Sequence, residues 1–423
     1  MTGESELIEK NKIVKDKLWT KTYLLFIFMY FGNVSCLYYY NGTMTLIGES
    51  LSGSVVMAGF LSSVYSLVPL FFRPFVGTVI DKYGRWKSNC AGIVITFATI
   101  VGYLFAGNIY QLIALRAIGG LAFCITSTAN YTSASDLIPE SRKTEGLGWF
   151  QNMGTISTYI GPALALYALT LTPNSYVGLH IGGMILCGFA FVMNLFINYE
   201  KDPEYIQKRQ EALKAEQNAR KVDGQAEATE VSEAGHYILG LQFRTWFLVM
   251  AMLLVTCAHS TVNSYFILSA DKRGITGISN FFLFMAAGMF IARAFISRLA
   301  DEKGMLKVYV PILAIGSACL VILGSFDNVM LLNIAAFPYG FLFGTSAAVC
   351  QSNIVKSAPM KKQAFANSMY LIAVDVGYGV FPIISGMIIK SVGYAHIFLV
   401  AAVLPIVAIA FVIMFVMNQK KIR

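Results

Sequence analysis

The sequence predicts an all-α integral membrane protein with twelve transmembrane helices in two pseudo-symmetric six-helix bundles. Three observations support this fold class. The chain is 56% hydrophobic and only 13% charged, whereas an ordinary soluble domain carries roughly 25% charged residues. Twelve apolar stretches divide it, most of them near the ~20 residues that a helix needs to cross a bilayer. A basic motif that begins at Arg73 and ends at Lys87 recurs between Arg293 and Lys307.

The repeat extends well beyond this motif. Within it, Arg, Phe, Asp, Gly and Lys coincide position for position. A register kept over so many positions indicates two copies of a six-span unit, and parallel repeats in a membrane are typical of transporters. The same offset relates four further pairs: Gly120 and Gly340, Phe123 and Phe343, Pro139 and Pro359, and Pro162 and Pro382.

Hydrophobicity places the spans, with ends uncertain by about two to four residues. The six spans of the first copy are predicted at Tyr23–Leu46, Val55–Val76, Asn89–Ala106, Gln111–Ala129, Leu147–Leu169 and Val177–Ile197. Those of the second copy are predicted at Trp246–Ala270, Ile278–Leu299, Val308–Leu323, Val329–Cys350, Ala364–Ile388 and Ala395–Met417. The domains expected are a tail (1–22), a bundle (23–198), a central loop (199–244), a second bundle (245–418) and a short tail (419–423).

Lysine and arginine predict the orientation. Of the 32 in the chain, 26 fall in the two tails, the central loop and the other loops after even-numbered spans. Only Lys272, Arg273 and Lys390 lie on the other side. Because positive charge is retained in the cytoplasm, both termini are expected there, in the plasma membrane of a bacterium. The net charge of +9 is therefore a topology signal, and no nucleic-acid partner is expected.

The remaining composition favours neither an enzyme nor a cofactor protein. The seven cysteines fall in or beside spans without CxxC spacing, so we interpret them as core residues and expect no metal site. No nucleophile elbow or phosphate-binding glycine loop is present. No cleavable signal peptide is expected, because 22 mostly polar residues precede the first span.

The loop after the second span carries the most specific motif, Gly77-x-x-x-Asp81-Lys-x-Gly84-Arg85-x-Lys87. It resembles the signature of the major facilitator superfamily. Arg116-Ala-Ile-Gly119-Gly120 in the fourth span and residues 136–146 in the next loop agree with that family in order. Within the superfamily the chain is most similar to the drug and metabolite efflux branch, whose members commonly exchange substrate for protons.

The resemblance implies a gating role for the loop motif. Gly77 should let its helix approach a neighbour closely, and Gly84 should permit the tight reversal between two spans. Asp81 is expected to face the N-terminus of the eleventh span, where its charge meets the helix dipole. Arg85 is placed to pair with Asp136, and Asp301 would repeat the role of Asp81 near Glu145 and Gly146. We interpret both clusters as cytoplasmic latches that hold the halves together when the cavity faces outward.

Ionisable residues inside spans are functional candidates, because each is costly to insert. Asp375, in the middle of the eleventh span, is the leading protonation site; the alternative is a structural partner of Arg116 or of a nearby hydroxyl. Arg116 has a structural ion-pair or carbonyl-capping role, couples to proton movement, or contacts an anionic substrate. His259 is the next candidate for coupling, and the alternative for it is a packing residue.

Spans one, four, seven and ten line the cavity in the resembling family, which gives the substrate-binding candidates. They share polar or aromatic character on one helix face. They are Asn33, Tyr40, Asn41, Arg116, Phe123, Ser127, His259, Asn263, Tyr339 and Phe343.

The predicted function is secondary active transport by alternating access, as proton-coupled export of a small amphiphilic organic compound or drug. The first alternative is a proton symporter or exchanger that imports a small organic anion. The second is a non-transporting membrane receptor. The partners expected are the substrate, protons and the lipid bilayer, and we expect a monomer.

Overall fold

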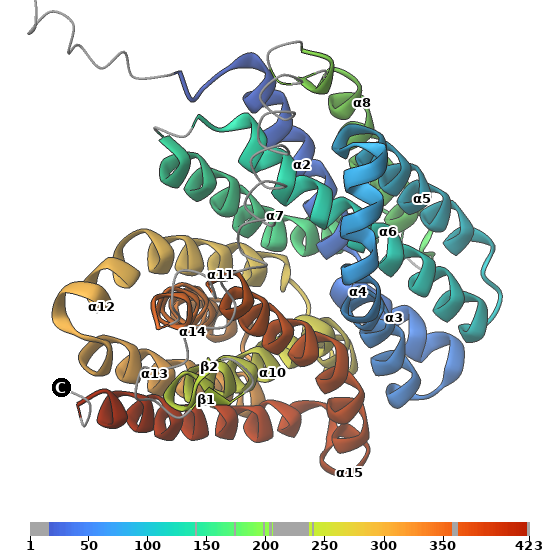
Figure 1. The fold of residues 1–423 in the computed structure, drawn as a ribbon. Helices are drawn as coiled ribbons and strands as arrows, with labels where there is room; N and C mark the ends of the chain where they lie inside the picture. Colours follow the sequence, from blue (N-terminus) through green and yellow to red (C-terminus); the bar gives the residue numbers. More distant parts are fainter. Residues whose placement is uncertain are drawn as a thin grey trace, which may run out of the picture.

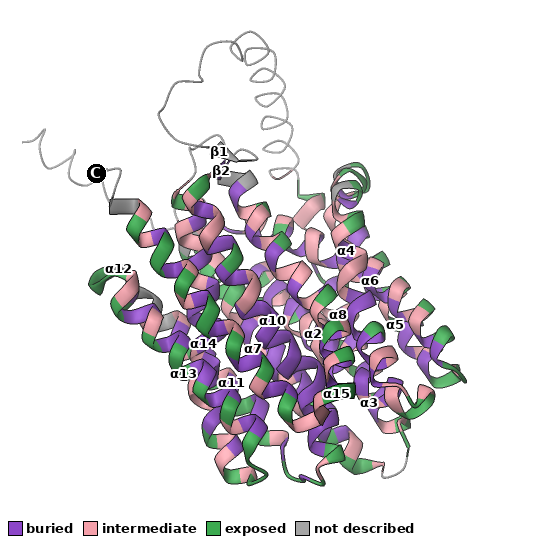
Figure 2. Cartoon of the chain, turned by 90° about the horizontal axis from the view of Figure 1, so that it is seen from below, coloured by how far each residue is buried: buried purple, intermediate pink, exposed green. Residues whose placement is uncertain are grey.

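The computed structural model is a bundle of long helices with loops at its two ends (Figures 1 and 2). It describes residues 17–139, 142–172, 175–197, 199–202, 205, 237–238, 241–357 and 363–420. The side chains of Asp81 and Asp301, and most of the central loop, lie outside this description.

The first half contains α2 to α8. These helices are α2 (Lys21–Tyr39), α3 (Asn41–Ser52), α4 (Val55–Tyr83), α5 (Arg85–Phe105), α6 (Ile109–Leu137), α7 (Lys143–Leu171) and α8 (Val177–Leu195). The first span, predicted as one helix over Tyr23–Leu46, is broken at Tyr40 into α2 and α3. A 3₁₀ turn, η2 (Tyr199–Lys201), follows α8.

The second half begins after two short antiparallel strands, β1 (Tyr237–Ile238) and β2 (Leu241–Gln242). It contains α10 (Phe243–Lys272), α11 (Ser279–Ile291), a π-helix η3 (Ala292–Ile296), α12 (Ser297–Lys303), α13 (Met305–Ser325), α14 (Val329–Lys356) and α15 (Gln363–Lys420). Figure 1 shows the halves side by side, blue to green at the upper right and yellow to red at the lower left.

Twelve crossings result from these helices. Ten described helical stretches are long and apolar enough to cross a membrane, and one of them, Ala366–Asn418, has 53 residues. At 1.5 Å per residue that length suffices for two crossings of a ~30 Å hydrocarbon layer, and α15 bends at Gly393, whose φ is 87°. The remaining crossing is α11, which continues through η3 into α12. The predicted fold class is confirmed.

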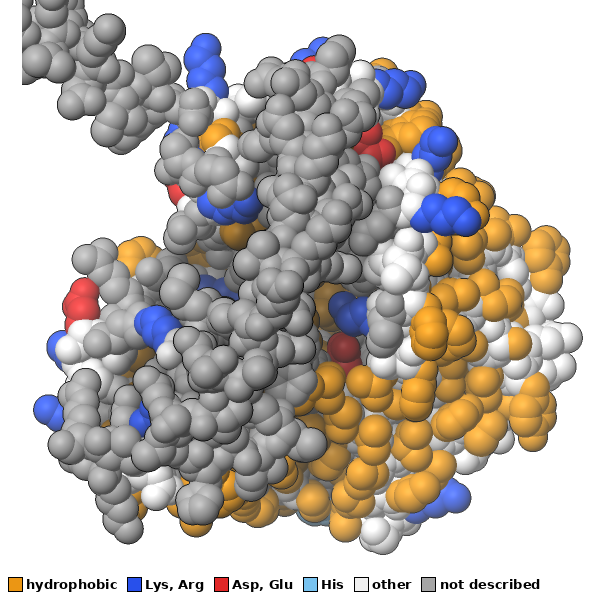
Figure 3. Space-filling model, viewed as in Figure 1, with side chains coloured by type: hydrophobic (Ala, Val, Ile, Leu, Met, Phe, Trp, Pro, Cys, Tyr) orange, Lys and Arg blue, Asp and Glu red, His pale blue; other side chains and the backbone are white. Residues whose placement is uncertain are grey.

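The outer surface of the bundle is apolar. Large hydrophobic side chains such as Phe71, Phe75, Phe105 and Met330 are about 70–80% exposed, and hydrophobic side chains cover much of the flank in Figure 3. In water such a surface would be unfavourable, whereas in a bilayer it contacts lipid. We call the side where α2 begins and α15 ends the terminal side, which faces the viewer in Figures 1 and 3.

The sequence repeat is also a repeat of local structure. Gly84 and Gly304, which end the second and eighth spans, have φ of 92° and 90°, a left-handed conformation that favours glycine. Asn108 caps α6 by accepting the N–H of Gln111 (3.0 Å), and its counterpart Asn328 caps α14 by accepting that of Leu331 (3.1 Å). The two halves therefore use the same turns and caps at equivalent positions of the repeat.

Close helix packing repeats in the same way. A Cβ on Gly120 would lie 2.8 Å from the carbonyl oxygen of Tyr65, and one on Gly340 would collide with that of Met285. Tyr65 and Met285 are themselves equivalent positions of the two copies. Glycine at these two positions lets α6 approach α4, and α14 approach α11, at backbone distance, as small residues commonly do between membrane helices.

Gly340→Ala should therefore destabilise the second half. The added methyl must displace the backbone of α11, and overpacking of this kind costs about 1–3 kcal/mol. Reaction of the buried cysteines with a fluorogenic maleimide during thermal unfolding in detergent would report the change. The control is Gly188→Ala in α8, where no described heavy atom lies within 4 Å of the added Cβ. Equal stability of the two variants would contradict this account of packing.

Candidate functional site

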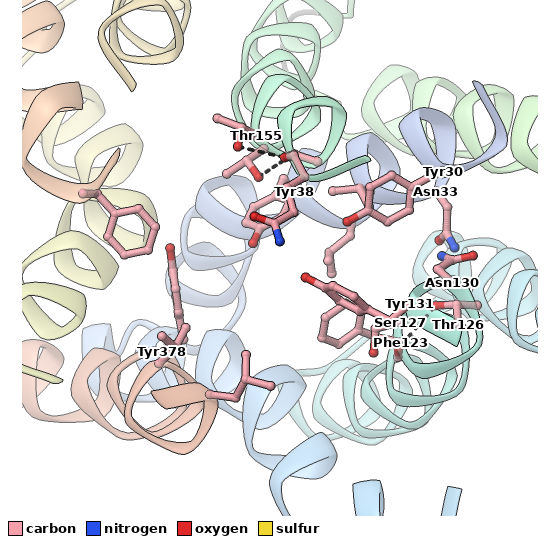
Figure 4. Close-up of a pocket in the computed structure, with 18 of the residues that line it drawn as sticks. Tyr30, Asn33, Tyr38, Phe123, Thr126, Ser127, Asn130, Tyr131, Thr155 and Tyr378 are labelled. Carbon is pink, nitrogen blue, oxygen red and sulfur yellow. Dashed lines mark hydrogen bonds between the residues drawn. The ribbon is translucent and has the colours of Figure 1, made fainter. Parts of the chain in front are cut away.

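A cavity of about 220 Å³ lies between the two halves. Its lining comes from α2, α6 and α7 of the first half and from α11, η3, α14 and α15 of the second. Figure 4 shows the labelled side chains converging on this space from opposite sides. A solute bound here would contact both halves, which is the position that alternating access requires.

Four of the predicted substrate-binding residues line the cavity. They are Asn33, Phe123, Ser127 and Phe343. Asn33 comes from α2, and Phe123 and Ser127 lie one turn apart on α6, as helical spacing predicted. Figure 4 labels three of them around the opening.

The other six predicted substrate-binding residues are absent from the lining. They are Tyr40, Asn41, Arg116, His259, Asn263 and Tyr339. Tyr40 points into the first half, with its hydroxyl 3.3 Å from Nδ1 of His180. Asn263 Nδ2 donates to the hydroxyl of Tyr378 (3.4 Å), which does line the cavity.

His259 lies behind the cavity wall, and its side chain is fully buried. Its ring stacks on Phe343 with centroids 4.0 Å apart. The two ring nitrogens lie 3.4 Å from the hydroxyl of Tyr159 and 3.5 Å from that of Tyr339. These contacts support the packing alternative in this conformation, and a role in proton coupling stays a prediction.

Arg116 is only 1% exposed and is not part of the cavity lining. Its guanidinium carbon is 4.2 Å from the centroid of the Tyr65 ring, a cation–π contact that contributes about 2 kcal/mol when it is desolvated. No carboxylate pairs with it among the described residues. An aromatic ring therefore takes the place of the ion pair considered for it from the sequence.

Asp375 pairs with Arg73, a partner that the sequence analysis did not consider. Arg73 Nη2 lies 3.3 Å from Asp375 Oδ2, and the side chains are 30% and 20% exposed. Arg73 belongs to α4 and Asp375 to α15, so the pair joins the two halves. The partner is therefore neither Arg116 nor a hydroxyl, the alternatives considered from the sequence, because residues so far apart in the chain meet only through the packing of α4 on α15. The protonation role of Asp375 stays a prediction.

Five tyrosines line the cavity that were not predicted as site residues. Tyr30, Tyr38, Tyr131, Tyr370 and Tyr378 all contribute to the wall. A hydroxyl at the tip of an apolar ring suits a site that must hold solutes of mixed polarity. The signal for Tyr38 was its place beside Tyr40, whereas nothing in the sequence distinguished Tyr131 or Tyr370.

Arg293 is the charged residue of the lining that was not predicted as a site residue. It heads the second copy of the basic motif, as Arg73 heads the first. This shared position was the available signal for both arginines.

The loop motif is built around Arg85 and Asp136. Arg85 Nε lies 2.9 Å from Asp136 Oδ2, the partner expected from the sequence. Both residues belong to the first half, so this pair joins α5 to α6 rather than one half to the other. Tyr205 donates a hydrogen bond to the same carboxylate (2.8 Å).

Glu200 completes this cluster, which the sequence did not predict. Its carboxylate accepts the backbone N–H groups of Arg85 (2.6 Å) and Trp86 (3.1 Å) at the start of α5, where the helix dipole favours negative charge. A Cβ on Gly84 would lie 2.9 Å from Glu200 Oε2. The turn therefore requires glycine at position 84 for two reasons: the φ is positive, and a larger side chain would collide with the carboxylate of Glu200.

The rest of the motif has no inter-half contact among the described side chains. No described heavy atom lies within 4 Å of a Cβ on Gly77, so the close approach expected there is absent. Lys87 is exposed. The contacts expected of Asp81 and Asp301 lie outside the described side chains, and Glu145 pairs with Arg142 (2.7 Å).

On the side opposite the termini, the halves are in direct contact. Lys272 Nζ of α10 lies 2.8 Å from Glu49 Oε2 of α3, and Tyr394 donates to Glu49 Oε1 (3.4 Å). Ser62 and Ser264 bring their hydroxyls to 3.3 Å across the same seam. This side of the cavity is therefore closed.

Metal ligation has no support in the described part of the chain. No group of three or more His, Cys, Asp or Glu side chains there could hold an ion. The seven cysteines are free.

A twelve-crossing bundle with a polar and aromatic cavity between two repeated halves defines a membrane transporter. A family model of the Major Facilitator Superfamily matches residues 24–373. The chain belongs to this superfamily, as its loop motif indicated.

Individual relatives are distant. The chain is 22% identical to the hexuronate transporter of Escherichia coli over 395 residues, which are 88% of each chain. It is 26% identical to the staphylopine export protein of Staphylococcus aureus over 126 residues, 30% of this chain and only 32% of that protein. Among solved structures, a bacterial homologue of the lysosomal transporter Spinster aligns with a TM-score of 0.68 and 13% identity, covering 94% of this chain and 96% of the other.

Glu49→Gln should loosen the closed side. The amide keeps the size of the side chain but loses the charge that attracts Lys272, and a partly exposed pair contributes about 0.5–1 kcal/mol. We expect a cysteine placed at Ser62 to react about two- to fivefold faster with an impermeant maleimide applied from that side.

The control for this prediction is Glu145→Gln, which removes a carboxylate from an ion pair inside the first half alone. If both substitutions change the reaction rate equally, the Glu49–Lys272 contact is not a closure between halves.

Proposed function

We propose that the protein is a proton-coupled secondary transporter that exports a small amphiphilic organic compound by alternating access. The observation that carries this proposal is the ion pair between Arg73 and Asp375, which joins α4 of the first half to α15 of the second, one residue from Val374 of the cavity lining. It places a carboxylate where its protonation would change the contact between the two moving bodies.

The coupling step follows from the charge of Asp375. As a carboxylate it attracts Arg73 and favours the conformation open on the terminal side; once protonated, it loses that attraction. The other groups within electrostatic range are Tyr38 of α2, and Tyr131 and Cys124 of α6. Both members of the pair are partly exposed, so the carboxylate is accessible for protonation.

The cavity chemistry suggests the class of solute. The five tyrosines and Phe123 and Phe343 supply apolar faces, and Asn33 and Ser127 supply neutral hydrogen-bonding groups. Such walls suit a compound with an aromatic or amphiphilic body better than a simple sugar, which would make few apolar contacts with the faces of the aromatic rings.

The direction that we propose is export. The bias of lysine and arginine supports cytoplasmic termini in a bacterial cell, and because the opposite side is closed, the cavity in this conformation would then exchange solute with the cytoplasm. Similarity to the staphylopine export protein over part of the chain agrees with that direction. We propose a multi-pass monomer in the cytoplasmic membrane without an enzymatic step or a cofactor.

A second candidate function is uptake of an organic anion together with protons. Arg293 in the cavity lining favours an anionic solute, and one relative aligned over most of its length is a hexuronate transporter. Export and uptake would share the same cavity and the same carboxylate, and would differ in the order of binding.

Asp375→Asn should abolish uphill transport while exchange of substrate down its gradient continues, because the amide mimics the protonated acid. Substrate-dependent proton movement in proteoliposomes, first screened over a metabolite and drug panel, would measure it. We expect at least about a tenfold loss of accumulation, which corresponds to ~1.4 kcal/mol of coupling.

The matched control is Asp327→Asn, which also removes a carboxylate from an arginine (Arg273, 2.6 Å) but lies away from the cavity. If Asp375→Asn still accumulates substrate, another residue carries the coupling proton, and His259 is the next candidate. Failure of the variant to fold would make Asp375 a structural partner of Arg73.

A further inference from the structure

Arg293 stands at an irregularity of the eighth span. The regular helix α11 ends at Ile291, and residues 292–296 form the π-helix η3 before α12 resumes. A π-helical turn is rare, occurs mostly as a single turn inside an α-helix, and is frequently found at functional sites. Here it coincides with the one arginine of the second half that lines the cavity among the described residues.

The sequence repeat shows that the carboxylate beside Arg73 has no equivalent beside Arg293. Arg293 is the counterpart of Arg73, and the counterpart of Asp375 is Thr155 on α7. The helices correspond as well, since α4 packs on α15 across the halves and α11 packs on α7. Where the repeat gives the first arginine a carboxylate, it gives the second a threonine.

Thr155 does not replace the carboxylate. Its hydroxyl donates to the carbonyl oxygen of Gln151 in its own helix (3.0 Å), and the residue lines the cavity as Figure 4 shows. No described carboxylate forms an ion pair with Arg293, and its buried Nε has no hydrogen-bond partner. An unpaired guanidinium in a low-dielectric wall is unfavourable until an anion reaches it.

We propose that Arg293 binds a carboxylate or equivalent anionic group of the substrate, in the place that Asp375 occupies beside Arg73. The transported compound is then a small organic anion with an apolar or aromatic body. This inference deepens the proposed function and rests on it, because it assigns a substrate class to the same cavity.

Charge balance and geometry agree with this assignment. Asp375 already neutralises Arg73, and Arg293 is the one charged side chain in the described lining, so a monoanion would neutralise the site. A guanidinium donates two parallel N–H groups to a carboxylate, a geometry that a single ammonium does not offer. The rings that would enclose the body of the solute are those of the cavity-lining tyrosines within electrostatic range of Arg293, namely Tyr30, Tyr38, Tyr131 and Tyr370.

The test uses charged thiol reagents as probes, so it needs no identified substrate. Gln151→Cys in the full-length protein places a reporter on the exposed cavity wall, one turn from Thr155. Its reaction rates are measured with an anionic sulfonatoethyl, a neutral methyl and a cationic trimethylammonioethyl methanethiosulfonate. The ratio of anionic to neutral rates cancels any change in the thiolate fraction of the cysteine. The chain without the reporter supplies the background of native cysteines, most of them buried.

We expect the anionic reagent to be favoured by about tenfold over the neutral one, and Arg293→Gln to remove most of that preference. Arg293→Lys should retain part of it, since the charge remains without the planar fork. Thr155→Asp should remove it as well, because the new carboxylate pairs with Arg293 as Asp375 pairs with Arg73. Thr155→Asn, of the same size without the charge, should keep it.

A preference unchanged by Arg293→Gln, or equal effects of Thr155→Asp and Thr155→Asn, would overturn the inference. Should Gln151→Cys fail to fold, Ser127→Cys on α6 reports from the opposite wall of the same cavity. These rates are measured without a proton gradient. If the protein with native Arg293 shows no anion preference while proton coupling through Asp375 is intact, this inference alone is removed. If it shows the preference while Asp375→Asn leaves coupling intact, the coupling proposal alone is removed.

Discussion

The free-energy cost of placing an arginine inside a membrane span explains the contacts found at the centre of this molecule. Each such residue costs about 2.5–3.5 kcal/mol to insert, and three of them are accommodated in different ways. Arg73 meets Asp375 across the halves, and Arg116 lies over the ring of Tyr65 within one half. Arg293 faces the cavity without a carboxylate among the described residues. The first arrangement supplies a titratable contact between the halves, the second a buried cation–π contact within one half, and the third a binding position for an anion.

The rest of the structure holds these arginines on two bodies that can move. Glycine contacts at Gly120 and Gly340 make each half compact, and Glu200 and Asp136 fix the start of α5 within the first half. Between the halves, the side opposite the termini is closed by Glu49 and Lys272. A change of state therefore exchanges a few polar contacts across the seam while the packing inside each half persists, as expected of rigid-body alternating access.

Much of this architecture was predictable because the sequence repeats. The fixed offset between the two copies supported the assignment of twelve spans, and the matching turns at Gly84 and Gly304 follow from it. Periodicity also placed Phe123 and Ser127 on the cavity face. It could not give the rotation of a helix about its axis, so Tyr40 and His259 were predicted on the wall and lie behind it. Nor could it give partners far apart in the chain, such as Asp375 and its arginine, which meet only where α4 packs against α15.

The central claim is that the charge of Asp375 sets the balance between the two conformations. Spin labels at positions 87 and 303, both exposed at the terminal side and in different halves, would report that balance as a distance distribution at several pH values. The account predicts that acidification depopulates the terminal-side-open state of the wild type, since protonation removes the attraction to Arg73, and that Asp375→Asn shows no such dependence. A distribution that titrates equally in both proteins would contradict it.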